Sequence, residues 1–196
     1  PSGSTTNNAT LPLIFTTSEP TTDFAVENII VTNGELDEFA TSSSTVYTAT
    51  FIPNADGAVT INVPADTFTD AVENYNTAAI EYTFIYDSTG PSTTISSTEL
   101  SPTSVSSIPI IITFDESVSA FESSDVTVGN GTVSSISGSG TTYTVNVLPA
   151  AEGAVTIDVA AGVCTDAAGN ANIEAAQFSI VYFSALYNVP GDYSTI

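Results

Sequence analysis

An internal repeat of about one small domain in length constrains this chain more than any other feature. The segment 24–86 recurs over 121–182, at an offset of 97 residues before a one-residue gap and 96 residues after it. A period of that size corresponds to a whole domain rather than to one unit of a solenoid. The 196 residues therefore predict two tandem domains of the same fold.

Each repeat has the pattern of an all-β domain. Short runs of alternating apolar and polar residues, such as 143–147, are separated by clusters of Gly, Asn, Ser and Pro. Such alternation is typical of strands with one buried face and one solvated face. In the second repeat we expect strands near residues 92–98, 107–114, 125–131, 132–138, 142–149, 153–160 and 175–183. That number of strands matches a constant-type immunoglobulin-like β-sandwich.

The first repeat lacks the strand that opens the second. Residues 11–17 correspond to 108–114, but the strand expected at 92–98 has its counterpart before or at residue 1. Residues 1–8 carry no apolar side chain beyond Pro1, so we expect a loose leader there rather than a core strand. The first domain, residues 1–88, is thus predicted to be incomplete, and the second, residues 89–184, to be complete.

The remaining residues, 185–196, resemble a linker that leads into an opening strand with no domain behind it. They end in Ser-Thr-Ile, which is similar to the Thr-Thr-Ile in the opening strand of the second repeat. We expect this tail to be a donor strand. Its expected contact residues are Leu186, Tyr187, Val189, Tyr193, Thr195 and Ile196.

A sheet that lacks an edge strand presents unpaired backbone groups, which another chain can fill. The tail leaves the far end of the second domain and spans at most ~40 Å, so the tail of a neighbouring copy is the better occupant. A head-to-tail contact of this kind generates an open homopolymer, here an extracellular filament. The predicted acceptor groove is formed by Leu11, Leu13, Phe15, Tyr82, Phe84 and Tyr86.

An alternative is that the chain is an excerpt of a longer tandem array. The missing strand would then belong to a preceding piece, and the chain would be a stalk or adhesive segment of a larger cell-surface adhesin. The start at Pro1, without Met, fits a processed secreted product, and a boundary cut within a longer protein would look the same.

The chain has no Lys, Arg or His, and its formal net charge is −22. This excludes nucleic acid and anionic membrane surfaces as partners, because no cation faces the phosphates. No apolar run approaches the ~18 residues that membrane insertion requires. The usual catalytic bases and phosphate clamps are also absent, and paired carboxylates of the glycosidase kind are the remaining option for an enzyme. Because the acids lie at turns, we expect no enzymatic activity.

Uncompensated carboxylates repel one another, and calcium prefers ligands of this type. Two groups of candidates lie at expected strand ends: Glu19, Asp70 and Asp87, and Asp115, Glu116, Asp166 and Asn170. Neither group has the spacing of an EF-hand loop, and solvated loop acids that need no metal are the favoured explanation. We expect no required cofactor, with calcium as the alternative. The lone Cys164 aligns with Phe68, which predicts a buried apolar role.

Residues 143–149, 152–157 and 165–170 resemble the bacterial Ig-like repeats of large surface and adhesion proteins. The resemblance covers nearly all of the second repeat and most of the first, which departs from it at 72–74. It implies an Ig-like sandwich, an extracellular location, calcium at interdomain joins and no catalytic residue. The expected missing strand and spare strand are separately similar to those of donor-strand filament subunits such as pilins, in architecture rather than in sequence.

Overall fold

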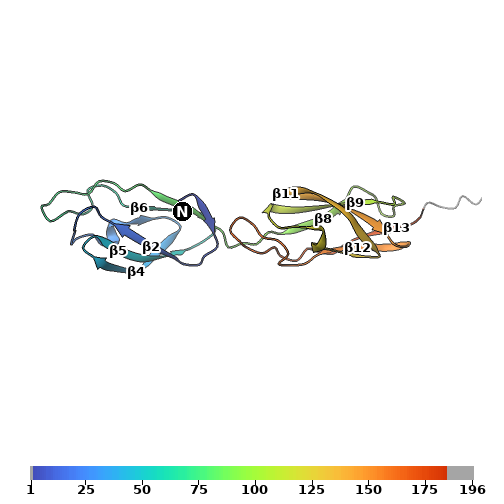
Figure 1. Ribbon diagram of the computed structural model, residues 1–196, viewed down its shortest axis with the longest axis horizontal. Helices are drawn as coiled ribbons and strands as arrows, with labels where there is room; N and C mark the ends of the chain where they lie inside the picture. The colour runs from blue at the N-terminus through green and yellow to red at the C-terminus, as the bar shows by residue number, and fades with distance from the viewer. Residues whose placement is uncertain (1, 185–196) are drawn as a thin grey trace, which may run out of the picture. The chain divides into compact units, whose positions relative to one another are not determined.

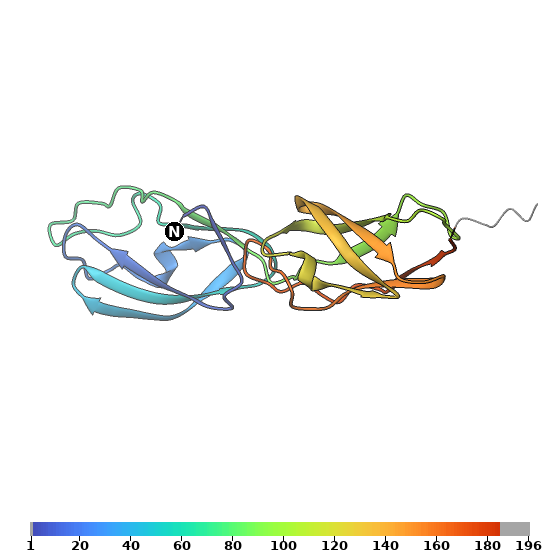
Figure 2. The same cartoon turned by 45° about the vertical axis from the view of Figure 1, so that its right-hand side comes forward.

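The computed structural model describes residues 2–184, and its regular structure is almost entirely β (Figure 1, Figure 2). The chain forms two compact units. One unit comprises the chain up to Thr89 together with Ala167–Asn170, and the other comprises Gly90–Asp166 and the described residues from Ala171 onward. No helix among the described residues is long and apolar enough to cross a membrane.

The described part of the first unit contains two sheets. Their strand orders are β1-β7-β6-β3 and β2-β5-β4. The strands are β1 (Ser4–Thr6), β2 (Leu11–Thr16), β3 (Ile30–Val31), β4 (Gly34–Ser43), β5 (Val46–Pro53), β6 (Gly57–Asn62) and β7 (Tyr82–Tyr86). All pairings are antiparallel except that of β1 with β7, which is parallel. A short 3₁₀ helix, Val26–Asn28, precedes β3.

The second unit repeats this plan with sheets of order β10-β12-β13 and β11-β9-β8. Its strands are β8 (Thr93–Ser97), β9 (Ile108–Val118), β10 (Val126–Gly129), β11 (Gly131–Pro149), β12 (Gly153–Val159) and β13 (Phe178–Tyr182). A 3₁₀ helix, Ser123–Asp125, precedes β10. The tandem β-sandwich expected from the sequence is therefore confirmed.

Three local expectations need correction. Residues 4–6 are not part of a loose leader, because β1 pairs with Phe84, Ile85 and Tyr86 of β7 through its backbone. The strands expected at 132–138 and 142–149 form one element, β11, whose register against β9 shifts between Gly140 and Thr142. The last strand begins at Phe178 rather than near 175.

The parallel pairing of β1 has a counterpart in the second unit. Thr103 forms a parallel bridge with Tyr182, and these two residues occupy the positions of Thr6 and Tyr86 in the repeat. The first unit therefore retains the short segment that lies beside its last strand. Among the described residues, only the counterpart of β8 is missing from it.

The core of the second unit is made by the inward-facing residues of its strands. Alternate positions of β9, of β12 and of the 143–147 part of β11 are buried, because successive side chains of a strand point to opposite faces and one face is turned to the core. The residues with no exposed surface are Ile108, Ile110, Ile112, Val145, Val147, Val155, Ile157 and Val159.

The core of the first unit depends more on aromatic side chains. The ring of Phe24 lies 4.8 Å from that of Tyr47 and 4.9 Å from that of Phe68, both edge to face, an arrangement that favours aromatic pairs. The buried Tyr47 hydroxyl donates to the Thr21 carbonyl at 2.8 Å, and burial raises its pKa. Phe15 also contacts Phe24, with ring centroids 6.0 Å apart, so β2 is attached to this cluster through one face.

Candidate acceptor groove

The strand β2 ends its sheet, whereas its counterpart β9 lies inside one. The backbone of β2 pairs with β5 alone, from Leu11 opposite Phe51 to Thr16 opposite Val46. In the second unit β9 pairs with β11 on one side and with β8 on the other, through five residue pairs from Thr93 opposite Phe114 to Ser97 opposite Ile110. One side of β2 is therefore an unpaired edge within the described chain.

The second unit shows which backbone groups of this edge are open. The carbonyl of Thr113 accepts a hydrogen bond from Thr94 Oγ1, and the amide of Asp115 donates to the Ser92 carbonyl. The backbone amides and carbonyls of residues two apart on a strand point toward the same neighbouring strand, so those of Ile111 also face β8. The counterparts of these residues in the first repeat are Ile14, Thr16 and Ser18. The amide of the intervening Thr17 donates in the opposite direction, to Thr45.

The apolar face of β2 is also incompletely covered. Its inward-facing residues Leu11, Leu13 and Phe15 are only half-buried. Their counterparts in the second repeat are Ile108, Ile110 and Ile112, which have no exposed surface. Equivalent positions in one fold thus differ in burial, and the difference follows the missing strand.

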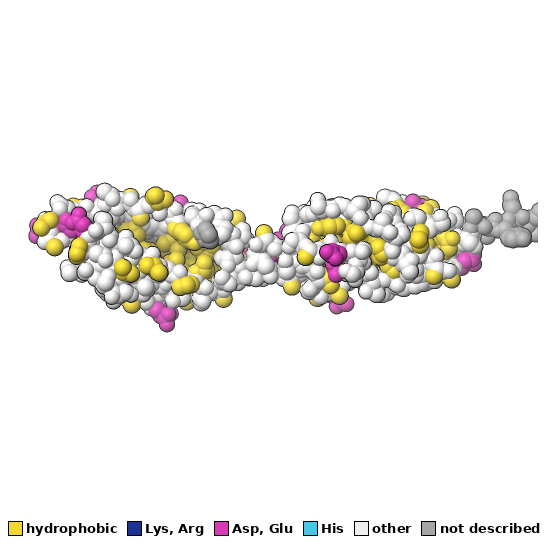
Figure 3. Space-filling model, in the orientation of Figure 1, with side chains coloured by type: hydrophobic (Ala, Val, Ile, Leu, Met, Phe, Trp, Pro, Cys, Tyr) yellow, Lys and Arg dark blue, Asp and Glu magenta, His cyan; other side chains and the backbone are white. Residues whose placement is uncertain are grey.

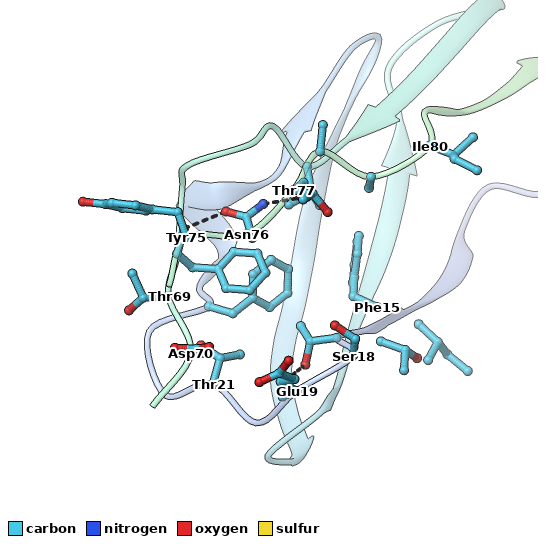
Figure 4. A pocket seen from close by; sticks show the side chains of 18 of the residues that line it. Phe15, Ser18, Glu19, Thr21, Thr69, Asp70, Tyr75, Asn76, Thr77 and Ile80 are labelled. Atoms are coloured by element: carbon cyan, nitrogen blue, oxygen red, sulfur yellow. Dashed lines mark hydrogen bonds between the residues drawn. The ribbon is translucent and has the colours of Figure 1, made fainter. Parts of the chain in front are cut away.

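A groove of about 880 Å³ lies along this edge of the first unit. One wall is β2 and the residues after it, the opposite wall is the segment that leads into β7, and the floor is aromatic and aliphatic. Figure 3 shows hydrophobic side chains exposed in a hollow on this unit, and Figure 4 shows Phe15 on one side of the groove with Asn76 and Thr77 on the other. The floor and wall residues on which the argument depends are Leu13, Phe15, Phe24, Ile61, Phe68 and Tyr82.

The second unit shows what can fill such a groove. There β8 lies against residues 176–178, and a residual cavity of about 240 Å³ is lined by Thr93, Ile95 and Phe178 among others. Residues 80–82, the counterparts of 176–178, line the groove of the first unit. The groove is therefore the site at which the homologous domain holds a strand.

The two edges of the same sheet differ in how they are protected. The outer face of β4 carries exposed Glu35, Asp37 and Glu38, and its pairing with β5 is interrupted between Asp37 and Ala40. Charges and bulges are common devices that keep an edge strand from pairing with other chains. The exposed residues of β2 include Ile14, which is 73% exposed, and none of them is charged. Apart from Pro12, whose counterpart Pro109 lies outside the pairing with β8, this edge lacks the protection that the opposite edge has.

The structure brings together part of the set predicted for the groove. Leu13, Phe15 and Tyr82 line it, whereas Leu11 lies outside the lining. Phe84 is buried in the core, and Tyr86 pairs with Thr6 because β1 occupies that part of the edge of β7. The predicted donor residues Leu186, Tyr187, Val189, Tyr193, Thr195 and Ile196 lie outside the described residues.

Sequence reasoning missed Phe24 and Phe68 as groove residues. Both precede or follow the strands that the alternation identified, so periodicity gave no reason to assign them to this face. The internal repeat held the signal, because Phe68 stands where the second repeat has the smaller Cys164. A larger side chain at that position fills space beneath an incomplete sheet.

The first predicted group of acidic ligands does not converge in the described chain. Glu19 and Asp70 both line the groove, and Asp87 does not. Hydrogen bonds from Asn74 Nδ2 and from the amides of Asn74 and Val72 lower the pKa of Asp70, so its carboxylate is committed to its own loop.

The second acidic group is only partly assembled. The Asp115 carboxylate accepts hydrogen bonds from the amide and hydroxyl of Ser92, and these bonds lower its pKa. Glu116 and Asp166 each offer a carboxylate oxygen within 4.8 Å of the other. Asn170 groups with the first unit, where its side-chain amide donates to the Asp87 carbonyl. A calcium ion at these residues stays a prediction.

A comparison with known families agrees with the tandem fold described above. The sequence profile of the bacterial Ig-like domain matches residues 2–85 and again residues 87–182. The chain belongs to the bacterial Ig-like domain family. Domains of this family are typically structural rather than enzymatic. The first match covers the unit without a β8 counterpart and the second covers the unit that has β8, so two copies of one family domain account for the sequence repeat.

Among solved structures, that of InvD from Yersinia pseudotuberculosis is similar at 13% identity with a TM-score of 0.47. The similarity covers 95% of this chain and 57% of InvD, so this chain spans a little over half of that one. Among curated proteins, the search finds no significant relative.

Proposed function

We propose that this bacterial Ig-like protein is a structural subunit of an extracellular filament. In this proposal, the groove of the first unit accepts residues 185–196 of another copy as an added strand beside β2. The observation that carries the proposal is the open edge of β2 above an apolar groove, at the place where the homologous second unit holds β8.

Strand addition satisfies both deficits of the first unit. Five residue pairs join β8 to β9 in the second unit, and an equivalent strand would pair with the open groups of Ile14 and Thr16. It would also cover Leu13 and Phe15, at roughly 25 cal/mol for each Å² of apolar surface removed from water. Backbone pairing supplies affinity in this mode of recognition, and side chains at alternate positions supply specificity.

The tail sequence suits such a strand. Tyr187, Val189 and Tyr193 occupy odd positions, whereas the even positions 188, 190, 192 and 194 carry Asn, Pro, Asp and Ser. Between residues 187 and 194, a strand of this sequence presents its aromatic and aliphatic side chains on one face, and Leu186 and Ile196 flank that stretch on the other. Burying the odd face leaves Asp192 in solvent, which matters because the chain has no cation to neutralise a buried carboxylate.

The contact joins different surfaces on the two copies, so it is heterologous. Such contacts extend into a filament unless the rotation between copies closes a ring. The surface Ig-like character of the family and a chain without Lys, Arg or His fit an extracellular polymer, which trypsin-like proteases have no site to cut. No cofactor is needed for this assembly.

Two variants of the full chain test the proposal. The first, the acceptor, lacks residues 185–196 and can only receive a strand. The second, the donor, carries an added copy of residues 92–98 before Pro1, which fills its own groove and leaves only its tail to give. We expect the wild-type chain to form filaments visible by electron microscopy, neither variant to form them alone, and the two variants to form a one-to-one complex by size-exclusion chromatography with light scattering.

Two other results would count against the proposal. Filaments that persist when residues 185–196 are deleted would reject the proposal. Another result would favour the alternative of a stalk segment, whose groove is filled by a preceding part of a longer chain. In that result the acceptor does not bind the donor, but it is stabilised when residues 92–98 are added before its own Pro1.

A further inference from the structure

We propose a second contact between copies, made by two apolar surfaces that the added strand would bring together. The exit patch consists of Leu100, Val105 and Phe183 in the second unit, and the mouth patch consists of Val72 and Tyr75 in the first. This inference rests on the head-to-tail filament proposed above and names the surface that completes its junction.

The exit patch lies where the chain leaves the second unit. The Thr103 amide donates to the Val181 carbonyl at 2.8 Å, and the Phe183 amide donates to the Thr103 carbonyl at 2.9 Å. The amide of Val105 donates to Thr103 Oγ1 at 3.2 Å. These bonds hold residues 101–105 against the end of β13. Leu100 is 85% exposed, and Phe183 and Val105 are exposed as well.

The mouth patch lies where a donor strand would enter the groove. In the second unit the first residue of β8, Thr93, pairs with Phe114, whose counterpart in the first repeat is Thr17. Tyr75 lines the groove, and Figure 4 shows its ring directed away from the groove. Tyr75 is 66% exposed, and Val72 on the same loop is 75% exposed.

The internal repeat provides a control for both patches. Val72 and Tyr75 correspond to Ala168 and Ala171 in the second repeat. The fold therefore does not require large apolar side chains at these positions. In each unit, large apolar side chains occur at the end that the proposed filament places against another copy, and the equivalent end of the other unit lacks them.

The same control applies to the exit patch. Leu100, Val105 and Phe183 stand where the first repeat has small or acidic and amide side chains, namely Gly3, Asn8 and Asp87. Exposed apolar residues that gather in one patch commonly mark a protein–protein contact, whereas single ones are ordinary. Each patch gathers large apolar residues at one end of one unit, and the equivalent positions of the other unit carry small or polar side chains.

The length of the tail limits the gap between the two patches. Ser184, beside Phe183, is held by the Glu152 carboxylate through its amide and hydroxyl. Asp56 holds Ser88 in the same way in the first repeat. Of the 12 residues after Ser184, a five-residue strand like β8 leaves seven, which span at most ~25 Å when fully extended. The exit patch of one copy must therefore lie close to the groove mouth of the next.

The test measures dissociation of the donor–acceptor pair described above by surface plasmon resonance. The acceptor carries V72A and Y75A, and the donor carries L100G and V105N. Each change installs the residue of the other repeat at an exposed position, so the fold has a precedent for it. The control is I30A in the acceptor, which removes a side chain that is 55% exposed on β3, outside both patches.

We expect each patch variant to dissociate at least about tenfold faster than the wild-type pair, and the control to dissociate at the wild-type rate. Combining the two patch variants should add little to either alone, because they remove the same contact. The inference is overturned, and the filament proposal stands, if the donor and acceptor without patch substitutions bind each other but the patch variants dissociate within twofold of their rate. A wild-type pair that does not form overturns both.

Discussion

Truncating the same position in the two repeats provides a quantitative test of the open groove. Ile110 and Leu13 are counterparts, but Ile110 has no exposed surface, whereas Leu13 is half-buried beside the groove. Replacing a fully buried Leu or Ile by Ala costs about 2–5 kcal/mol, and less where the site is already open to water. We expect I110A to destabilise the second unit by about 3 kcal/mol and L13A to destabilise the first by about 1.5 kcal/mol.

Filling the groove should remove this difference. With residues 92–98 added before Pro1, Leu13 becomes covered as Ile110 is, and the cost of L13A should rise to about 3 kcal/mol. Differential scanning calorimetry resolves the two units if they unfold separately, and each variant identifies the transition it shifts. The near-ultraviolet circular dichroism of the tyrosines provides a second probe, since the chain has 8 Tyr and no Trp.

Equal costs for L13A and I110A in the chain without the added strand would refute this reasoning, because the face of β2 would then be as well covered as that of β9. A cost of L13A that does not change when the strand is added would contradict the position assigned to that strand. Both outcomes are measured by truncating side chains, so the backbone pairing of β2 and β9 stays in place.

Three further results are expected. Hydrogen bonds from Thr21 and Thr69 lower the pKa of Asp23 in the folded chain. The ionised Asp23 therefore stabilises the fold above the ordinary pKa of Asp, about 3.9, and this stabilisation is lost as pH falls through the lowered pKa of the folded state. The stability advantage of the wild-type chain over D23N, measured by urea unfolding, should vanish in that acid range. Burial raises the pKa of the Cys164 thiol to about 11, so a thiol reagent at pH 8 should modify it only as fast as the second unit unfolds. Millimolar calcium should raise the melting temperature of the second unit and should fail to do so in E116Q; no shift in either chain would show that Glu116 and the buried Asp166 bind no calcium.

The sequence was most informative where the repeat gave an internal comparison. Alternation identified most strands of the second unit, because one face of each is buried and the other is solvated. The absence of a β8 counterpart from the described residues could be predicted from the repeat, because the offset places that counterpart before or at residue 1. Ser4–Thr6 could not be predicted as a strand, because its pairing with β7 uses backbone groups and needs no apolar side chain.

The groove was predicted in position but not in composition. Leu13, Phe15 and Tyr82 lie on strands whose inward face the alternation assigns. Phe24 and Phe68 lie in segments between strands, where the direction of a side chain depends on tertiary contacts such as the Phe24–Phe68 ring pair. Local patterns carry no information about such contacts, so only the structure could add these residues to the groove.

Amide hydrogen exchange at the edge of β2 tests the central claim most directly. In the free chain, the amides of Ile14 and Thr16 face the open side, whereas those of their counterparts Ile111 and Thr113 face β8. We predict fast exchange at Ile14 and Thr16, slow exchange at Ile111 and Thr113, and protection of the first pair once filaments form. Slow exchange at Ile14 and Thr16 in the chain before assembly would show that this edge is already paired, and would contradict the account.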